Sequence, residues 1–191
     1  MGPGGCGPVS GMRIEVEVKC RIDDISGFER RLREAGAKRI DDVIERDVYY
    51  SHPCRDFAGT DEALRIRVFG KKANLTYKGP KLDAKSKSRE EIIIGLEDDG
   101  KAAAMLERLG FRNVAGVRKR RRVYALGMFE VCVDSVAGLG NYAEVEAVAP
   151  KKGYEKVRDK AIALLVKLGG KKMERRSYLE LLLSRQDQIG P

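Results

Sequence analysis

The sequence predicts an α+β protein built on a closed, eight-stranded antiparallel β-barrel with a charged lumen and helices packed outside. Eight short segments carry alternating charged and apolar residues, or β-branched and aromatic residues, as strands do. Gly and Pro punctuate these segments as turns. Residues 23–36 resemble residues 98–110 at an offset of about 74 residues, each following a charged, alternating strand, which favours two similar sheet halves that close into a barrel.

Length and composition favour one domain. The chain has 191 residues and 42% apolar residues, enough to bury a core without disulfides. It contains neither 18 consecutive apolar residues nor a signal-peptide pattern, so we expect a cytoplasmic protein without a membrane span. We expect disordered tails at 1–11 and 185–191 and a single domain over 12–184.

The charge indicates an anionic partner. The formal net charge is +9, from 38 Lys and Arg against 29 Asp and Glu. This fits a nucleotide, a polyphosphate or a nucleic acid, although a generally basic, solvated surface gives the same balance. The four cysteines form no Cys-x-x-Cys pair and His52 is the single histidine, which argues against a zinc site.

The first half of the chain reads as one strand, a helix and four more strands. The opening strand covers 13–21 and the helix covers 25–35, with Asp24 or Ser26 as N-cap and Gly36 as its stop. The four strands that follow are expected at 39–50, 62–69, 73–79 and 88–95.

The second half repeats the arrangement and ends in helices. A helix at 98–109 stops at Gly110. The next three strands are expected at 112–124, 128–136 and 142–148. Two C-terminal helices are expected at 153–168 and 174–184.

The opening strand has one charged face. Side chains alternate across a strand, so Glu15, Glu17 and Lys19 project together, opposite the apolar residues from Ile14 to Cys20. Strand geometry places the two carboxylates about 7 Å apart. Carboxylates at this spacing beside an ammonium suit a hard divalent cation and the phosphate oxygens that accompany it.

Later strands repeat this pattern, which an antiparallel sheet with one solvated face also produces. That alternative explains less well why like charges share a strand. With the charged face turned inward, the lumen holds six acids and seven bases. The acids are Glu15, Glu17, Glu91, Asp134, Glu144 and Glu146, and the bases are Lys19, Arg65, Arg67, Lys78, Arg89, Lys119 and Arg121. Such buried charge needs ligands, and a metal with a polyphosphate supplies them.

The motifs together resemble the CYTH superfamily, which contains class IV adenylyl cyclases and thiamine triphosphatases, over about 13–183. They comprise Glu15-x-Glu17-x-Lys19, Arg65-x-Arg67, Lys78-Gly-Pro, Lys119-x-Arg121-x-x-Tyr124, Asp134 before Gly138-Leu-Gly140, Glu144-x-Glu146 and Arg176-Ser-Tyr178. The class IV cyclase branch is the most similar. The resemblance implies an eight-stranded triphosphate tunnel as the fold.

The resemblance also implies roles for these residues. Lys19 and Tyr49 would act in catalysis, with Lys19 orienting or deprotonating the nucleophile. The six acids would hold Mg²⁺ or Mn²⁺. The triphosphate would be bound by Arg65, Arg67, Lys78, Arg89, Lys119 and Arg121. The expected partner is a small-molecule triphosphate, with neither a membrane nor a nucleic acid, and the protein would be a monomer or homodimer.

Three functions stay open at this point. The leading hypothesis is conversion of ATP to cyclic AMP and pyrophosphate. The alternative is hydrolysis of inorganic triphosphate, thiamine triphosphate or a nucleoside triphosphate. The six basic side chains that would bind the triphosphate, called the clamp below, would serve equally well when water is the nucleophile. A non-catalytic module for polyphosphate or RNA ends is the third, with Arg118, Arg120 and Arg122 as an outer basic stripe.

Overall fold

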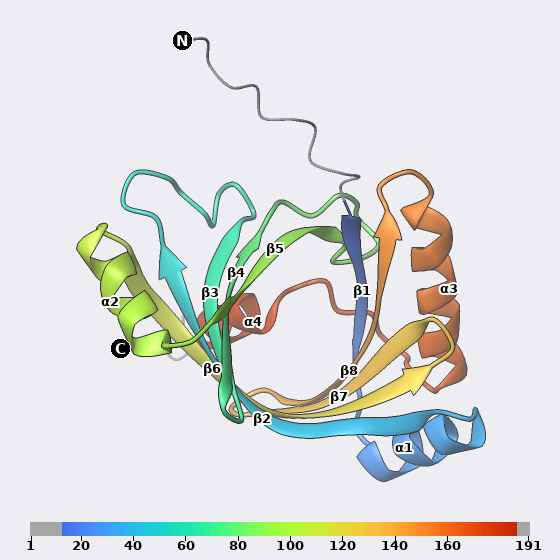
Figure 1. The fold of residues 1–191 in the computed structure, drawn as a ribbon. Coiled ribbons are helices and arrows are strands. Elements are labelled where there is room, and N and C mark those ends of the chain that lie inside the picture. Colours follow the sequence, from blue (N-terminus) through green and yellow to red (C-terminus); the bar gives the residue numbers. More distant parts are fainter. Residues whose placement is uncertain (1–12, 187–191) are drawn as a thin grey trace.

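The computed structural model describes residues 13–186, and these form the expected barrel. Eight antiparallel strands close in the order β1-β5-β4-β3-β2-β6-β7-β8 (Figure 1). The strands are β1 (Arg13–Arg21), β2 (Lys38–Ser51), β3 (Ala63–Phe69), β4 (Lys72–Lys78), β5 (Arg89–Leu96), β6 (Arg112–Leu126), β7 (Phe129–Val136) and β8 (Gly140–Pro150). The fold class predicted from the sequence is therefore confirmed.

The closure of the barrel is uneven. β1 pairs with β8 along its whole length, from the Arg13–Pro150 pair to the Arg21–Tyr142 pair. On its other side β1 pairs with β5 only at Ile14–Glu90 and Glu15–Arg89. Beyond Glu90, β5 remains bonded to β4 and diverges from β1.

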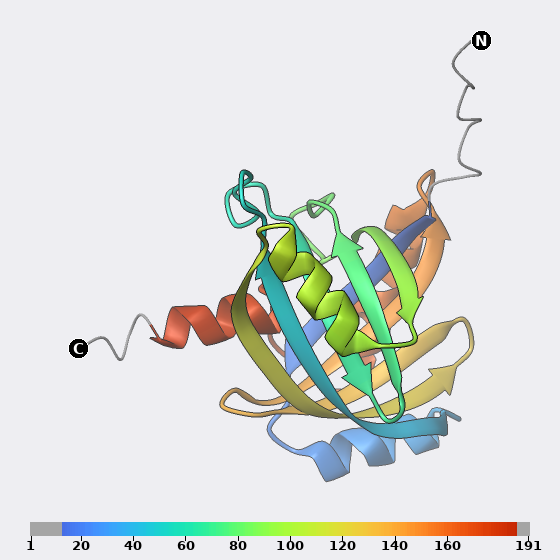
Figure 2. The same cartoon turned by 60° about the vertical axis from the view of Figure 1, so that its left-hand side comes forward.

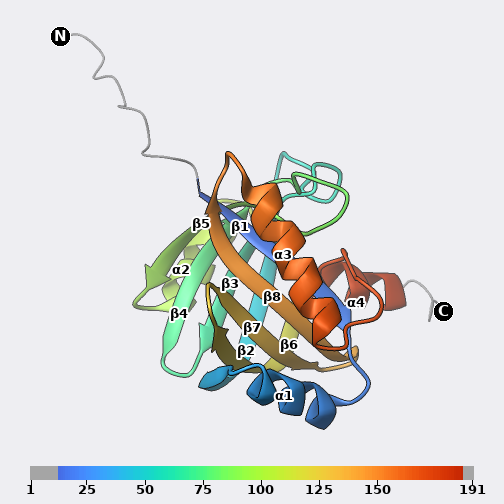
Figure 3. The same ribbon diagram turned by 90° about the vertical axis from the view of Figure 1, so that its right-hand side faces the viewer.

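Helices cover the outside of the barrel. α1 (Ile25–Glu34) begins at the N-cap Asp24, whose carboxylate accepts from Gly27 N at 2.9 Å, and Gly36 follows it with φ 86°. α3 (Tyr154–Lys167) lies across β1 and β8 (Figure 3). α2 (Asp99–Arg108) packs on the β3 side (Figure 2). None of the helices within residues 13–186 is long and apolar enough to cross a membrane.

The main apolar core lies outside the barrel wall rather than in its lumen. Val16 and Val18 on the outer face of β1 pack in one cluster with Phe28 of α1 and Leu165 of α3. A second cluster under α2 contains Leu106. Since the helices supply the apolar partners, the inner face of the strands is free to carry charge.

The C-terminal helix begins later than predicted. The sequence suggested a helix at 174–184, whereas α4 covers Tyr178–Gln186. Residues before it extend along β1, because Glu174 N donates to Lys19 O at 2.8 Å. α4 then runs two residues into the tail expected at 185–191. The rest of that tail and the tail expected at 1–11 lie outside the described residues.

A reciprocal cap sets the start of α4. Glu180 N donates to Ser177 Oγ at 3.1 Å, and Ser177 N donates to a Glu180 carboxylate oxygen at 2.6 Å. Ser-x-x-Glu is the sequence signature of such a capping box. Tyr178 thereby occupies the first turn and is directed toward the lumen.

Candidate active site in the barrel lumen

The lumen holds a cavity of about 540 Å³. Its lining comes from the inner faces of the strands, together with the segment before β5 and the start of α4. Lys19 and Asp134 are the two sequence-predicted site residues that do not line it. The others, which do, are Glu15, Glu17, Tyr49, Arg65, Arg67, Lys78, Arg89, Glu91, Lys119, Arg121, Glu144 and Glu146.

Three of the predicted acids meet in one group, the three-carboxylate cluster of Glu17, Glu144 and Glu146. Glu17 on β1 stands directly opposite Glu146 on β8, and Glu144 lies two residues away on β8. One oxygen from each side chain lies within 4.8 Å of the others. An all-oxygen donor set of this kind fits Mg²⁺ or Mn²⁺.

Glu146 is difficult to ionise within this cluster, even with Arg121 beside it. Burial and the charges of Glu144 and Glu17 raise the pKa of Glu146 to about 8, although Arg121 opposes the shift. A carboxyl that resists ionisation beside two others gains most from a positive ligand.

Glu15 and Glu91 form a separate pair around one ammonium. Lys78 contacts Glu91 directly and lies 3.8 Å from Glu15 Oε2. Burial raises the pKa of Glu15 despite Lys78. For Glu91, burial is outweighed by the charge of Lys78 together with hydrogen bonds from Glu15 and Lys78, which lower its pKa to about 2. Glu15 and Glu91, which the sequence predicted as metal ligands, therefore lie beside the ammonium of Lys78.

Asp134 is fully buried and surrounded by donors. Arg121 grips it bidentately at 2.8 and 2.6 Å, Lys119 lies at 3.3 Å, and the Tyr178 hydroxyl donates to it at 2.9 Å. These contacts use both carboxylate oxygens. Asp134 thus orients two predicted phosphate-binding side chains instead of joining the three-carboxylate cluster.

Two acids of β2 contact the basic side chains of the clamp, and the sequence did not predict either of them. Asp47 accepts a bidentate pair from Arg67 at 2.7 and 2.8 Å, and Glu45 lies 3.0 Å from the same guanidinium and 3.1 Å from Lys119. Parity was the available signal, since Glu45, Asp47 and Tyr49 share one face of β2. Arg46 between them disguised it.

Arg65 retains an unused donor in the lumen. Its side chain is buried, and Nε has no hydrogen-bond partner among residues 13–186. Arg65 lines the cavity, and a buried guanidinium with an unpaired N–H gains a hydrogen bond when an anion binds beside it.

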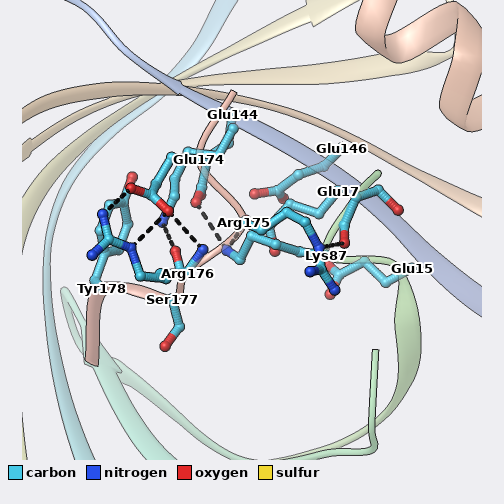
Figure 4. Close-up of polar contacts among 12 residues, drawn as sticks. Glu15, Glu17, Lys87, Glu144, Glu146, Glu174, Arg175, Arg176, Ser177 and Tyr178 are labelled. Atoms are coloured by element: carbon cyan, nitrogen blue, oxygen red, sulfur yellow. Dashed lines mark hydrogen bonds and ion pairs between the residues drawn. The ribbon is translucent and has the colours of Figure 1, made fainter. Parts of the chain in front are cut away.

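Lys87 is the third lumen residue that sequence reasoning missed. It stands just before β5, and its ammonium contacts Glu17 and lies 3.3 Å from Glu144 Oε1 (Figure 4). It shares the parity of Arg89 and Glu91, but the exposed Lys85 has that parity too, so parity gives only a partial signal.

Lys19 is buried beside the start of α4 and does not line the cavity. Its Nζ donates to Arg176 O at 2.6 Å and lies 4.0 Å from the centre of the Tyr178 ring. Burial, with the charge of Lys87, lowers its pKa to about 7. Lys119 also approaches the Tyr178 ring, at 5.0 Å. Tyr49 packs in the same apolar cluster as Tyr178, and no hydrogen bond within the described chain joins Tyr49 to Lys19.

One part of the cavity is apolar. The lining includes Phe57 and Ala58 from the loop between β2 and β3, and Leu179 and Leu183 from α4. His52 stacks beside Phe57 with ring centres 5.6 Å apart. The lumen can therefore hold a polyanion and a divalent cation, with room for an organic group beside them.

Comparison with known proteins gives one family. A CYTH domain model matches residues 13–178. The protein named "Putative adenylate cyclase MJ0240" from Methanocaldococcus jannaschii is 40% identical over 171 residues, which is 88% of this chain and 98% of that protein. "Adenylate cyclase CyaB" from Aeromonas hydrophila is 32% identical over 178 residues, with 88% of each chain covered.

Solved structures show the same fold. The PH1819 protein from Pyrococcus horikoshii has a TM-score of 0.85 and 41% identity, covering 90% of this chain and 99% of that one. A Hippeastrum protein, described as an adenylyl cyclase candidate with a dominant triphosphatase activity, has a TM-score of 0.65 and 20% identity. It covers 92% of this chain and 97% of its own.

Proposed function

The chain belongs to the CYTH domain family, and on this premise we propose that it is a divalent-metal-dependent enzyme that converts ATP to cyclic AMP and pyrophosphate. The observation that carries the proposal is the cavity of about 540 Å³, where phosphate-binding cations face the three-carboxylate cluster. The names of the relatives at 40% and 32% identity support the cyclase reaction.

The basic side chains of the lumen would bind the substrate. Arg65 and Arg67 on β3 and Lys119 and Arg121 on β6 present their donors to one cavity. Bonds from buried acids hold three of these four side chains in place before the substrate arrives, so little side-chain entropy is lost on binding. Lys78 and Arg89 extend the same clamp along β4 and β5.

The metal would be held by the three-carboxylate cluster. Mg²⁺ or Mn²⁺ bound there would shield the phosphate charge and acidify the attacking hydroxyl. Glu17 and Glu144 are buried, so the field of their carboxylates on a bound cation is little screened by solvent.

In the proposed reaction the ribose 3′-hydroxyl oxygen bonds to the α-phosphorus. The bond from that phosphorus to the bridging oxygen breaks, and pyrophosphate leaves with the electron pair. The hydroxyl proton passes to a base, for which we propose Lys19. Lys19 lies behind the cavity-lining Tyr178 and is reached by a movement of that side chain. Its pKa of about 7 provides a neutral amine at neutral pH. Tyr49, which lines the cavity, would orient the nucleophile.

The alternative is a triphosphatase. Water would attack the terminal phosphorus and the bond to its bridging oxygen would break, with the same clamp and the same acids. The observation that favours it is the composition of the site: most of the charged residues of the lining are ones proposed to bind phosphate or metal, and hydrolysis of inorganic triphosphate needs no others. The activity described for the Hippeastrum protein on the same fold supports this alternative.

A product analysis tests both reactions. Purified protein is incubated with ATP, GTP, thiamine triphosphate and inorganic triphosphate, each with Mg²⁺ and with Mn²⁺, and the products are separated by chromatography. Cyclic AMP with pyrophosphate supports the cyclase. Release of phosphate without cyclic AMP rejects it in favour of the hydrolase. Glu17→Gln should be inactive, and the exposed Glu34→Gln on α1 should match the unmodified protein.

A further inference from the structure

The three-carboxylate cluster already has two cations supplied by the chain. Arg121 contacts Glu144 and lies 3.2 Å from Glu146 Oε1, and Lys87 is the cation on its Glu17 side. The Lys87 ammonium contacts Glu17 Oε1 and lies 3.3 Å from Glu144 Oε1, so it uses oxygens from two of the three carboxylates (Figure 4). Lys87 is 8% exposed, and solvent therefore screens these contacts little. In charge and position, this ammonium does what a bound metal would do.

The backbone of Lys87 is fixed, so only its side chain can leave the cluster. Lys87 N donates to Glu17 O at 2.9 Å. Arg175 fastens the preceding residues by donating to Ser86 O at 3.3 Å and Asp83 O at 2.8 Å. The contact between Lys87 and the cluster is thus a built feature of the loop between β4 and β5.

A metal and this ammonium cannot share the cluster. Lys87 contacts Glu17 Oε1 and Glu144 Oε1, and Arg121 contacts Glu144 Oε2, so both oxygens of Glu144 are in use before a divalent cation binds. A divalent cation beside the Lys87 ammonium would also be strongly repelled in a buried site. Because Lys87 also lines the cavity, its ammonium can turn from the cluster to an anion held there.

We propose that Lys87 is an internal counter-ion that competes with the divalent cation and is drawn from the cluster by the phosphates of the substrate. Metal and triphosphate binding are coupled through it: the substrate gives Lys87 new acceptors, and its departure frees one oxygen of Glu17 and one of Glu144. The inference rests on the proposed metal role of the cluster and adds to it a positioning residue that disfavours metal binding in the absence of substrate.

Mn²⁺ binding to the protein alone tests this. Free Mn²⁺ is titrated by electron paramagnetic resonance at pH 7.5 without any triphosphate, for unmodified protein, Lys87→Met, Lys87→Arg and Lys85→Met. Removing a charge within a few ångströms of the metal should tighten Mn²⁺ binding at least about fivefold in Lys87→Met. Lys87→Arg, which keeps the charge, should bind weakly like the unmodified protein.

Lys85→Met is the matched control, because Lys85 is an exposed lysine of the same loop and loses the same overall charge. Circular dichroism establishes that each variant is folded, and if Lys87→Met is not, Lys87→Gln replaces it. Equal Mn²⁺ affinity in Lys87→Met and Lys85→Met overturns the inference while leaving the metal role intact. If no protein in the set binds Mn²⁺, the inference and the metal role fail together. Glu17→Gln should abolish binding in the Lys87→Met background.

Discussion

Arg67 illustrates how a buried guanidinium is kept ready to bind an anion. Its fork is held by both oxygens of Asp47, and Glu45 lies beside it at 3.0 Å. Breaking a buried ion pair leaves an uncompensated charge, which costs more than the pair contributes when intact. The acids of β2 therefore affect both the stability of the fold and the geometry of the clamp.

Asp47→Asn should destabilise the protein by roughly 3 kcal/mol at pH 7, because two buried guanidinium groups lose their nearest carboxylate. Although burial opposes it, the charges of Arg65 and Arg67 hold the pKa of Asp47 below its usual range. The folded protein thus binds fewer protons than the unfolded chain near pH 4. Stability from Asp47 is present above the unfolded pKa of about 4 and is lost as pH falls through the lower folded pKa.

Urea unfolding at pH 7 and at pH 3 checks this. The difference between unmodified protein and Asp47→Asn should shrink at the lower pH. Asp42→Asn, on the outer face of the same strand, also removes a bidentate arginine pair, here with Arg120 at 2.9 and 2.8 Å. Its effect at pH 7 should be much smaller, since solvent screens that pair. If the difference in unfolding free energy between unmodified protein and Asp47→Asn were the same at both pH values, the lowered pKa of Asp47 would be contradicted.

At the scale of elements, α4 determines how the lumen is closed. Its capping box places Tyr178 against Asp134 and beside the ammonium of Lys19. Ser177→Ala removes one half of the box and should cost about 1 kcal/mol in unfolding free energy. Because the first turn then frays, it should also lower kcat/KM. Urea unfolding and steady-state kinetics measure the two effects.

Ser184→Ala provides the matched control for that change. Its hydroxyl lies near the other end of α4 and donates only to Leu181 O, at 3.1 Å, among the contacts of the described chain. It should leave kcat/KM unchanged. If Ser177→Ala and Ser184→Ala changed kcat/KM equally, the capping box would have no specific effect on the active site in the lumen.

β5 is the strand where the barrel is least tightly closed. Past Glu90 it is bonded to β4 alone, and Ile92, Ile93 and Ile94 are 52%, 58% and 57% exposed. Strand segments bonded on one side open locally at lower free energy than those bonded on both sides. Hydrogen exchange should therefore be faster at 91–96 than at 142–146 of β8, which is paired with β1 and β7. Equal protection of the two segments would show that the barrel closes fully in solution.

At the scale of the whole molecule, the barrel and most of its lumen were predictable from parity. Glu15, Glu17 and Lys19 alternate cleanly with apolar residues, and a clean alternation assigns both faces of a strand at once. The alternation does not assign the faces of β2, because Glu45, Arg46 and Asp47 are consecutive charged residues and neither face is apolar there. Its inner face becomes evident only when the arginines of β3 are seen opposite it.

Lys87 and the start of α4 were missed for other reasons. The loop before β5 is rich in lysine, and sequence alone does not separate an inward Lys87 from an exposed Lys85. The capping signal at Ser177 was present, but the long charged segment before it continues a helical pattern. Contact of residues 173–174 with β1 outweighs that local preference, which is a tertiary effect.

The basic run of β6 allows the inside and outside of the whole barrel to be compared in one experiment. Lys119 is buried and faces Glu45 and Asp134, whereas its neighbour Arg118 is exposed. Inorganic triphosphate with Mn²⁺ should raise the Tm of the unmodified protein, because a ligand at 100 times its Kd stabilises the folded state by about 2.7 kcal/mol. Lys119→Gln should lose most of that rise and Arg118→Gln should retain it, measured by differential scanning calorimetry at one ionic strength. Since both substitutions remove one charge, a loss that is equal in the two variants would mean that triphosphate binds the outer surface through net charge, and the lumen would not be its site.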